Sequence, residues 1–142
     1  MNFVLLLPLL VALPSASLAQ TVPAKGANTI AVVLPDSGIV AWKKTAQVLT
    51  MRGYSLKATD KDLLTLSTES KSTGRAGEVV IRATVIGRTV MLGGNFTTAI
   101  LDGSGARITY RGMQGSPFMV AWNELQEVAK ALGGALTYKI NP

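Results

Sequence analysis

Two stretches of the chain place apolar residues three and four positions apart, the spacing of an amphipathic helix. The first begins after the candidate N-cap residues Asp36 and Ser37 and ends before Gly53. The second follows Ser116-Pro117, a capping serine and a proline at the first helical position. Their apolar positions are Ile39, Trp42, Ala46 and Leu49, and then Phe118, Ala121, Trp122, Leu125, Val128, Ala129 and Leu132. We therefore predict two helices, with both tryptophans facing the core.

Around these helices, apolar and polar residues alternate, which is typical of half-buried strands. The alternation predicts strands at 54–59, 64–69, 79–85, 90–96 and 107–111, after a buried strand at 29–34 and before a short strand at 136–140. Residues 70–77 are predicted to be a polar loop. The order β-α-β-β-β-β-β-α-β predicts a single α+β domain at residues 29–142. In this fold class a mostly antiparallel β-sheet forms one layer, and both helices pack on one of its faces.

Residues 1–19 (MNFVLLLPLLVALPSASLA) have the pattern of an export signal, with an apolar run followed by Ser17-Leu18-Ala19 before Gln20. No Lys or Arg precedes the run, so the alternatives are an apolar N-terminal helix and an uncleaved anchor. The run is shorter than the roughly 20 residues that cross a bilayer. We expect residues 20–28 to form a flexible tether. The mature protein is expected to be periplasmic or secreted, with no transmembrane segment.

The chain of 142 residues contains no cysteine and no histidine, which excludes disulfides, zinc sites built from Cys and His, and Ser-His-Asp catalysis. Only eight Asp and Glu residues are present. Asp60 and Asp62 flank a predicted turn, and Glu124 and Glu127 lie one helical turn apart on the polar side of the second helix. We interpret both pairs as solvated. The sequence therefore predicts no enzyme, no cofactor and no metal site.

Positive charge is the remaining signal, because 14 Lys and Arg residues give a net charge of +6. If apolar strand positions point at the helices, alternation places the neighbouring side chains on the opposite sheet face. The basic candidates for a binding face are Lys57, Arg82, Arg107, Arg111 and Lys139. The hydroxyl-bearing residues expected beside them are Thr59, Thr65, Ser67, Thr84, Thr109 and Thr137, with Glu69 and Glu78 as opposing charges. Such a face suits an anionic glycan, a lipid headgroup or an acidic protein patch; the alternative is ordinary solubilising charge. An exported protein is not expected to bind nucleic acid.

The order of elements resembles that of helix-grip domains. The residues that carry the resemblance are Leu49-x-x-x-Gly53-Tyr54 at the end of the first helix and Gly115-Ser116-Pro117 before the second. The chain is similar in this respect to the BamC family of periplasmic assembly-factor lipoproteins and to small secreted bacterial proteins of unknown function. The resemblance covers the topology of residues 29–140, and the chain lacks the lipoprotein cysteine of that family. It implies a protein-interaction or ligand-holding module and supplies no functional residue to carry over.

These observations favour a non-enzymatic binding module that contacts a protein or an anionic envelope component through the basic sheet face or an exposed edge strand. The alternative is a small carrier that holds an apolar ligand between the helices and the sheet. A large apolar cavity would favour the carrier. A packed core beneath an exposed mixed face would favour the binding module.

The leader generates a first prediction. Protein purified from its native host should begin at Gln20, because export signals are removed after a small-x-small sequence. Intact-mass measurement distinguishes this product from a chain that keeps residues 1–19. A retained leader would contradict the expected periplasmic or secreted location.

Overall fold

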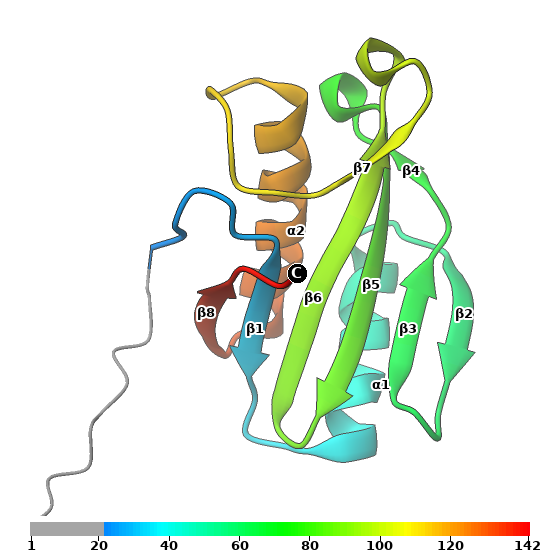
Figure 1. The fold of residues 1–142 in the computed structure, drawn as a ribbon. Helices are drawn as coiled ribbons and strands as arrows, with labels where there is room; N and C mark the ends of the chain where they lie inside the picture. Colours follow the sequence, from blue (N-terminus) through cyan, green and yellow to red (C-terminus); the bar gives the residue numbers. More distant parts are fainter. Residues whose placement is uncertain (1–21) are drawn as a thin grey trace, which may run out of the picture.

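The computed structural model describes residues 22–142, so the predicted leader lies outside the described residues. Within this range, two α-helices and eight β-strands follow one another along the chain (Figure 1). The helices are α1 (Gly38–Met51) and α2 (Pro117–Leu132). The strands are β1 (Thr29–Val33), β2 (Leu56–Asp60), β3 (Thr65–Thr68), β4 (Lys71–Ser72), β5 (Glu78–Ile86), β6 (Thr89–Thr97), β7 (Gly105–Arg107) and β8 (Ala135–Lys139).

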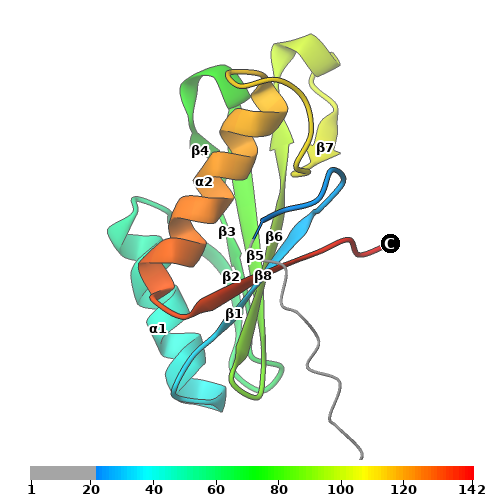
Figure 2. The ribbon, with the colours of Figure 1, turned by 90° about the vertical axis from the view of Figure 1, so that its left-hand side faces the viewer.

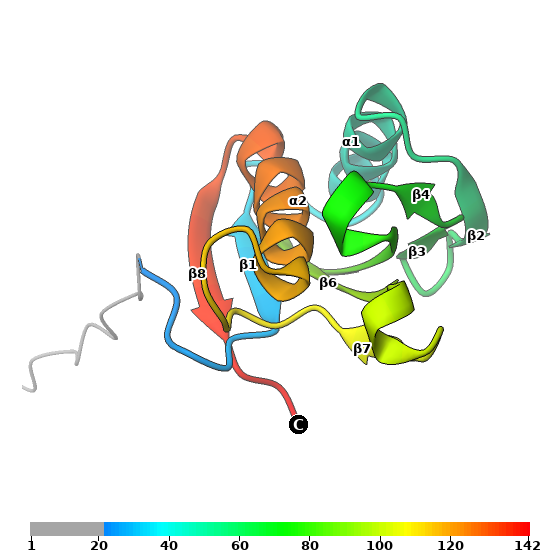
Figure 3. The same ribbon diagram turned by 90° about the horizontal axis from the view of Figure 1, so that it is seen from above.

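These eight strands form one antiparallel sheet in the order β2-β3-β5-β6-β1-β8, with β4 added beside β5 and β7 beside β6. Both helices pack on the same face of the sheet, as Figure 2 shows edge-on and Figure 3 shows from above. Strand β1 lies between β6 and β8 and so brings the two ends of the domain together. The predicted α+β class, with one mostly antiparallel sheet and two helices on one face, is confirmed.

Local sequence signals explain the ends of α2. The Ser116 hydroxyl accepts a hydrogen bond from Met119 N at 3.4 Å, and Pro117 occupies the first turn, where its missing N–H leaves no hydrogen bond unmade. The helix stops at Gly133, whose φ of 79° is left-handed and favours glycine. The side-chain cap that we expected for α1 is not formed, because Ser37 is at the N-cap position but its side chain makes no hydrogen bond to the helix.

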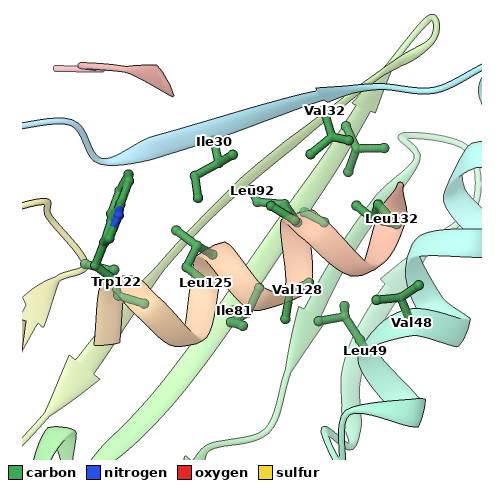
Figure 4. Packing of buried hydrophobic residues seen from close by; sticks show 14 of the residues in the cluster. Ile30, Val32, Val48, Leu49, Ile81, Leu92, Trp122, Leu125, Val128 and Leu132 are labelled. Atoms are coloured by element: carbon green, nitrogen blue, oxygen red, sulfur yellow. The ribbon is translucent and has the colours of Figure 1, made fainter. Parts of the chain in front are cut away.

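The long β5–β6 hairpin forms the centre of the sheet. Its nine-residue strands pair from Glu78 with Thr97 to Ile86 with Thr89, and alternate residues of both strands are buried. Both helices cover this buried side, with α1 in contact with β5 and β6 and α2 in contact with β6. Figure 4 shows the labelled side chains of α2 extending into the layer that also holds Ile30 and Leu92. Because these side chains are fully buried and belong to one cluster, the space between helices and sheet is filled.

The two tryptophans take different places in this core. Trp122 is fully buried and stacks obliquely against Tyr110 and Tyr138, with ring centroids 5.6 and 5.9 Å away. Trp42 is half-buried at the margin of the core, and its Nε1 donates a hydrogen bond to Thr65 O at 3.0 Å. The expectation that both tryptophans belong to the core therefore holds fully for Trp122 and in part for Trp42.

Two strand predictions need correction. The loop expected at 70–77 contains β4, which pairs Lys71 with Val79 and Ser72 with Glu78. The strand expected at 107–111 is instead β7 at Gly105–Arg107. Ile108 N still donates to Gly94 O of β6 at 2.9 Å, and the chain then leaves β6, because Tyr110 N bonds to Ala27 O at 2.7 Å.

Residues 26–28 belong to the domain and are not part of a flexible tether, contrary to our expectation. Gly26 N donates to Tyr110 O at 2.9 Å, and Ala27 is 1% exposed. Asn28 is buried and exchanges two hydrogen bonds with Asn141, as described below. The domain therefore begins before β1, because this segment pairs with residues that are distant in sequence.

Truncation of the central tryptophan tests this packing. Trp122→Ala should lower the free energy of unfolding by about 3 to 5 kcal/mol, because it leaves a cavity in a filled core. Trp42→Ala should cost less, since that ring is only half-buried. Val40→Ala on the exposed side of α1 is the control and should unfold at the parent's denaturant midpoint. An unchanged midpoint for Trp122→Ala would contradict the described core.

Candidate functional site

The sheet surface that faces away from both helices is here called the open face (Figure 2). Paired residues of an antiparallel sheet share a face, so the strand registers define it. Its central residues are Thr29, Ala31, Thr65, Ser67, Val80, Arg82, Thr84, Met91, Gly93 and Asn95, with Arg107 and Lys139 beside them. No helix of the described residues covers this surface, so it is free for contact.

Arg82 and Arg107 converge on a shallow hollow of about 200 Å³ in the open face. Arg82 on β5 pairs with Gly93 on β6, and Arg107 on β7 pairs with Asn95 on β6. The two arginines therefore flank β6 from opposite sides. We call this place the Gly93 hollow. Its lining residues are Asn28, Thr29, Arg82, Thr84, Met91, Leu92, Gly93, Gly94, Asn95, Arg107 and Asn141.

One wall of the Gly93 hollow is held by hydrogen bonds between the two ends of the domain. Asn28 Nδ2 donates to Asn141 O at 2.7 Å, and Asn141 N donates to Asn28 Oδ1 at 2.9 Å. Asn141 Nδ2 also donates to the Thr29 hydroxyl at 2.9 Å. Arg107 Nη1 donates to the main-chain oxygens of Asn141 and Pro142, at 3.0 and 3.1 Å. The guanidinium of Arg107 is thus oriented by the chain itself, and only its Nη1 is engaged.

The opposite side of the Gly93 hollow offers groups that the protein does not use. Within residues 22–142, the side chains of Arg82, Thr84 and Asn95 form none of the observed hydrogen bonds, and Arg82 forms no ion pair. Arg82 is exposed, and the other two side chains are half-buried. The hollow therefore presents guanidinium donors beside a carboxamide and a hydroxyl, each of which can both donate and accept.

Three of the five predicted basic residues share the open face. Lys139 pairs with Thr29 and lies there with Arg82 and Arg107, although it does not line the hollow. Four of the six expected hydroxyl-bearing residues join them: Thr65, Ser67, Thr84 and Thr137. Glu78 lies on the same face, as expected.

The regular alternation that we assumed for strand β2 is interrupted at Lys57. A β-bulge between Leu56 and Ala58 leaves Lys57 without a partner on β3. Beyond the bulge the register is reversed, so that Ala58 shares a face with Ser67. One extra residue therefore reverses the alternation after Lys57 and brings Asp60 onto the open face, where it pairs with Thr65.

Arg111 was also expected on the open face, and this expectation is wrong. Its guanidinium carbon lies 3.8 Å from the centroid of the Phe118 ring, a cation–π contact. Phe118 is in α2 and meets the buried Phe96 edge-on, with ring centroids 5.0 Å apart. Arg111 therefore lies on the helix side, because the chain leaves the sheet after β7.

The carboxylates of Asp60 and Glu127 contact residues that are near them in sequence. Asp60 Oδ1 accepts hydrogen bonds from the main-chain N–H groups of Asp62 and Leu63, both at 2.9 Å, so this pair forms the expected turn. Glu127 makes an exposed contact with Lys130 at 3.8 Å. Glu124 differs from our interpretation, because it is half-buried and its Oε1 accepts two hydrogen bonds.

A polar cluster around Glu124 was not predicted from the sequence. Glu124 accepts hydrogen bonds from Tyr54 Oη at 2.8 Å and from Lys71 Nζ at 3.1 Å. Lys71 Nζ also donates to Arg52 O at 2.8 Å and lies 4.5 Å from the centroid of the Tyr54 ring. We call these four residues the Tyr54 cluster. The cluster ties the end of α1 and strand β4 to α2, and no local pattern connects these three segments.

The Tyr54 cluster shifts two pKa values in opposite directions. Burial disfavours the charged form of Glu124, but hydrogen bonds from Tyr54 and Lys71 and the charges of Lys71 and Arg52 outweigh it, so the pKa of Glu124 lies below its ordinary value of 4.5. Burial, followed by the hydrogen bond to Glu124 and its negative charge, raises the pKa of Tyr54 well above its ordinary value of 10.0. At neutral pH the tyrosine is therefore neutral and the glutamate ionised.

Among residues 22–142, no three acidic side chains gather closely enough to hold a metal ion. Over the same range, neither helix is both long and apolar enough to cross a bilayer. No protein-family model matches the chain, and no curated protein matches it.

The Tyr54 cluster predicts a characteristic dependence of stability on pH. Because folding lowers the pKa of Glu124, its contribution is present above about pH 4.5 and is lost as pH falls through the lower folded value. Because folding raises the pKa of Tyr54, its contribution is present below pH 10 and is lost as pH rises further. Glu124→Gln should cost about 1 to 2 kcal/mol at pH 7 and reduce the loss of stability in acid.

Denaturant unfolding of the parent and of Glu124→Gln between pH 3 and 9 measures this effect. Glu127→Gln is the matched control, because Glu127 lies on the same helix but is exposed. Parallel curves for the parent and Glu124→Gln would show that the cluster does not contribute.

Proposed function

We propose that this chain is a non-enzymatic binding module, exported from the cytoplasm, which contacts an anionic partner through its open face. The observation that carries the proposal is the convergence of Arg82 and Arg107 on one hollow in an uncovered sheet. Guanidinium groups match carboxylate and phosphate oxygens in pairs, so two of them at one place favour an oxyanion. An envelope glycan, a lipid headgroup or an acidic protein patch provides such oxygens.

The packing between helices and sheet supports a binding surface over a carrier for an apolar ligand. A carrier needs an internal apolar cavity. Here the facing side chains of Trp122, Leu125 and Leu92 are all 0% exposed and belong to one continuous cluster. The Gly93 hollow, by contrast, lies on the surface and is lined largely by polar groups.

The state of the carboxylates supports a module that is not catalytic. A catalytic acid or base needs a pKa matched to its task and access to the substrate. Asp60 is bound in a turn, and the pKa of Glu124 is lowered by partners that hold it in the ionised form. Neither carboxylate lines the Gly93 hollow.

Salt-dependent retention tests the proposed function. The parent should be retained on polygalacturonate resin or on vesicles with an anionic phospholipid at low salt. It should elute as salt rises, because the Debye length falls from about 10 Å at 0.1 M to about 3 Å at 1 M. The double variant Arg82→Ser, Arg107→Ser should lose retention. Its fold should persist, since both side chains are exposed.

The control is the double variant Lys43→Ser, Lys44→Ser, which removes the same charge from the exposed side of α1. It should be retained like the parent. Equal loss in both double variants would indicate a general charge effect. Absence of salt-sensitive retention of the parent on any anionic surface would refute the proposed function.

A further inference from the structure

The Gly93 hollow combines charge, neutral polar groups and space in a way that narrows the class of ligand. We propose that it is a subsite for an acidic sugar residue, with the sugar carboxylate bound between Arg82 and Arg107 and its hydroxyls bound by Asn95 and Thr84. This inference rests on the proposed function and assigns the part of the open face that would provide specificity.

Gly93 is what makes the space. Its φ is not in the left-handed region, so the backbone does not require glycine at this position. A Cβ built there would meet only Asn28 O, at 3.5 Å, an ordinary van der Waals contact. A side chain at this position would therefore fit the strand and would project into the hollow. Glycine at position 93 therefore leaves the floor of the hollow uncovered between Arg82 and Arg107.

The two arginines beside this floor differ in whether the protein holds their guanidinium groups in place. Arg107 is oriented by Asn141 and Pro142 through Nη1, which leaves its Nε and Nη2 donors for a ligand. Arg82 has no partner among the described residues and can move onto a bound carboxylate. One guanidinium is thus preorganised and the other adaptable, so a single carboxylate can receive hydrogen bonds from both.

Neutral polar groups distinguish a sugar from a simple anion. A sugar hydroxyl both donates and accepts hydrogen bonds, and so do the Asn95 carboxamide and the Thr84 hydroxyl, which line the hollow. An inorganic oxyanion offers mainly acceptors and lacks the several hydroxyl groups of a sugar, so it would use chiefly the donors of the hollow.

The charge of the open face argues against a membrane surface as the ligand. Binding to anionic lipid commonly takes a cluster of about four to eight Lys and Arg residues. The strand registers place three on the open face, namely Arg82, Arg107 and Lys139, and they place Asp60 and Glu78 on the same face. A localised acidic ligand fits this balance better than an extended anionic surface.

Calorimetric titration of the full mature protein with trigalacturonate at low salt tests the inference. Neutral trigalactose and inorganic phosphate are the comparison ligands. The parent should bind trigalacturonate saturably, more tightly than phosphate, and should not bind trigalactose. Arg82→Lys keeps the charge but loses the planar fork, and should weaken binding by about tenfold or more.

Filling the hollow provides an independent variant. Gly93→Val introduces a β-branched residue that suits a strand, and it should weaken binding at least as much as Arg82→Lys. Gly93→Ala is a smaller step and should have an intermediate effect. The control Lys43→Ser on α1 should bind trigalacturonate like the parent. The far-UV circular dichroism and denaturant midpoint of each variant establish that it is folded.

The outcomes separate this inference from the proposed function. Trigalacturonate binding that is unchanged in folded Arg82→Lys and Gly93→Ala would place the ligand elsewhere and overturn the inference. Phosphate binding as tight as that of trigalacturonate would reduce the hollow to a simple oxyanion site and overturn the assignment to a sugar. Retention on anionic vesicles without saturable trigalacturonate binding would overturn the inference while leaving the proposed function in place.

Discussion

The alternation of side chains along the β5–β6 hairpin is the constraint on which the other features depend. Because successive residues of a strand point to opposite faces, burial of Ile81 and Leu92 beneath α2 requires Arg82 and Gly93 to lie on the other side. Packing of the hydrophobic core thus fixes the face on which the polar side chains of these strands lie, as well as the face of the apolar side chains. A slip of one residue would bury Arg82 without a partner, a cost that the packed core could not offset.

The second constraint is the meeting of the two ends of the domain at the same edge of the hollow. β1 lies between β6 and β8, so Asn28 before β1 and Asn141 after β8 come within hydrogen-bond distance although 113 positions separate them. Arg107, from a third segment, is bound to the same C-terminal residues. The wall of the hollow therefore forms only when the complete sheet has formed, and this links the geometry of the hollow to folding.

On the helix side, the Tyr54 cluster performs a related structural role. It places one ionised carboxylate among a phenol, an ammonium group and the end of α1, and so joins the end of α1 and strand β4 to α2 through polar contacts. Burial of Glu124 is tolerated because each of these groups donates to it or stabilises its charge. The negative charge of Glu124 is therefore paired within the fold, whereas the guanidinium of Arg82 has no such partner among the described residues.

The sequence by itself determined the class of fold, both helices and most strands, because periodicity reports which face of a local segment is buried. It also placed Arg82, Arg107 and Lys139 on one face, since each lies in a strand with regular alternation. Alternation did not predict the positions of Lys57 and Arg111, because the bulge in β2 and the end of β7 depend on how each strand pairs with its neighbour. The docking of residues 26–28, the convergence of two arginines at Gly93 and the Tyr54 cluster were likewise decided only by tertiary structure, because each requires contacts between segments that no local pattern relates.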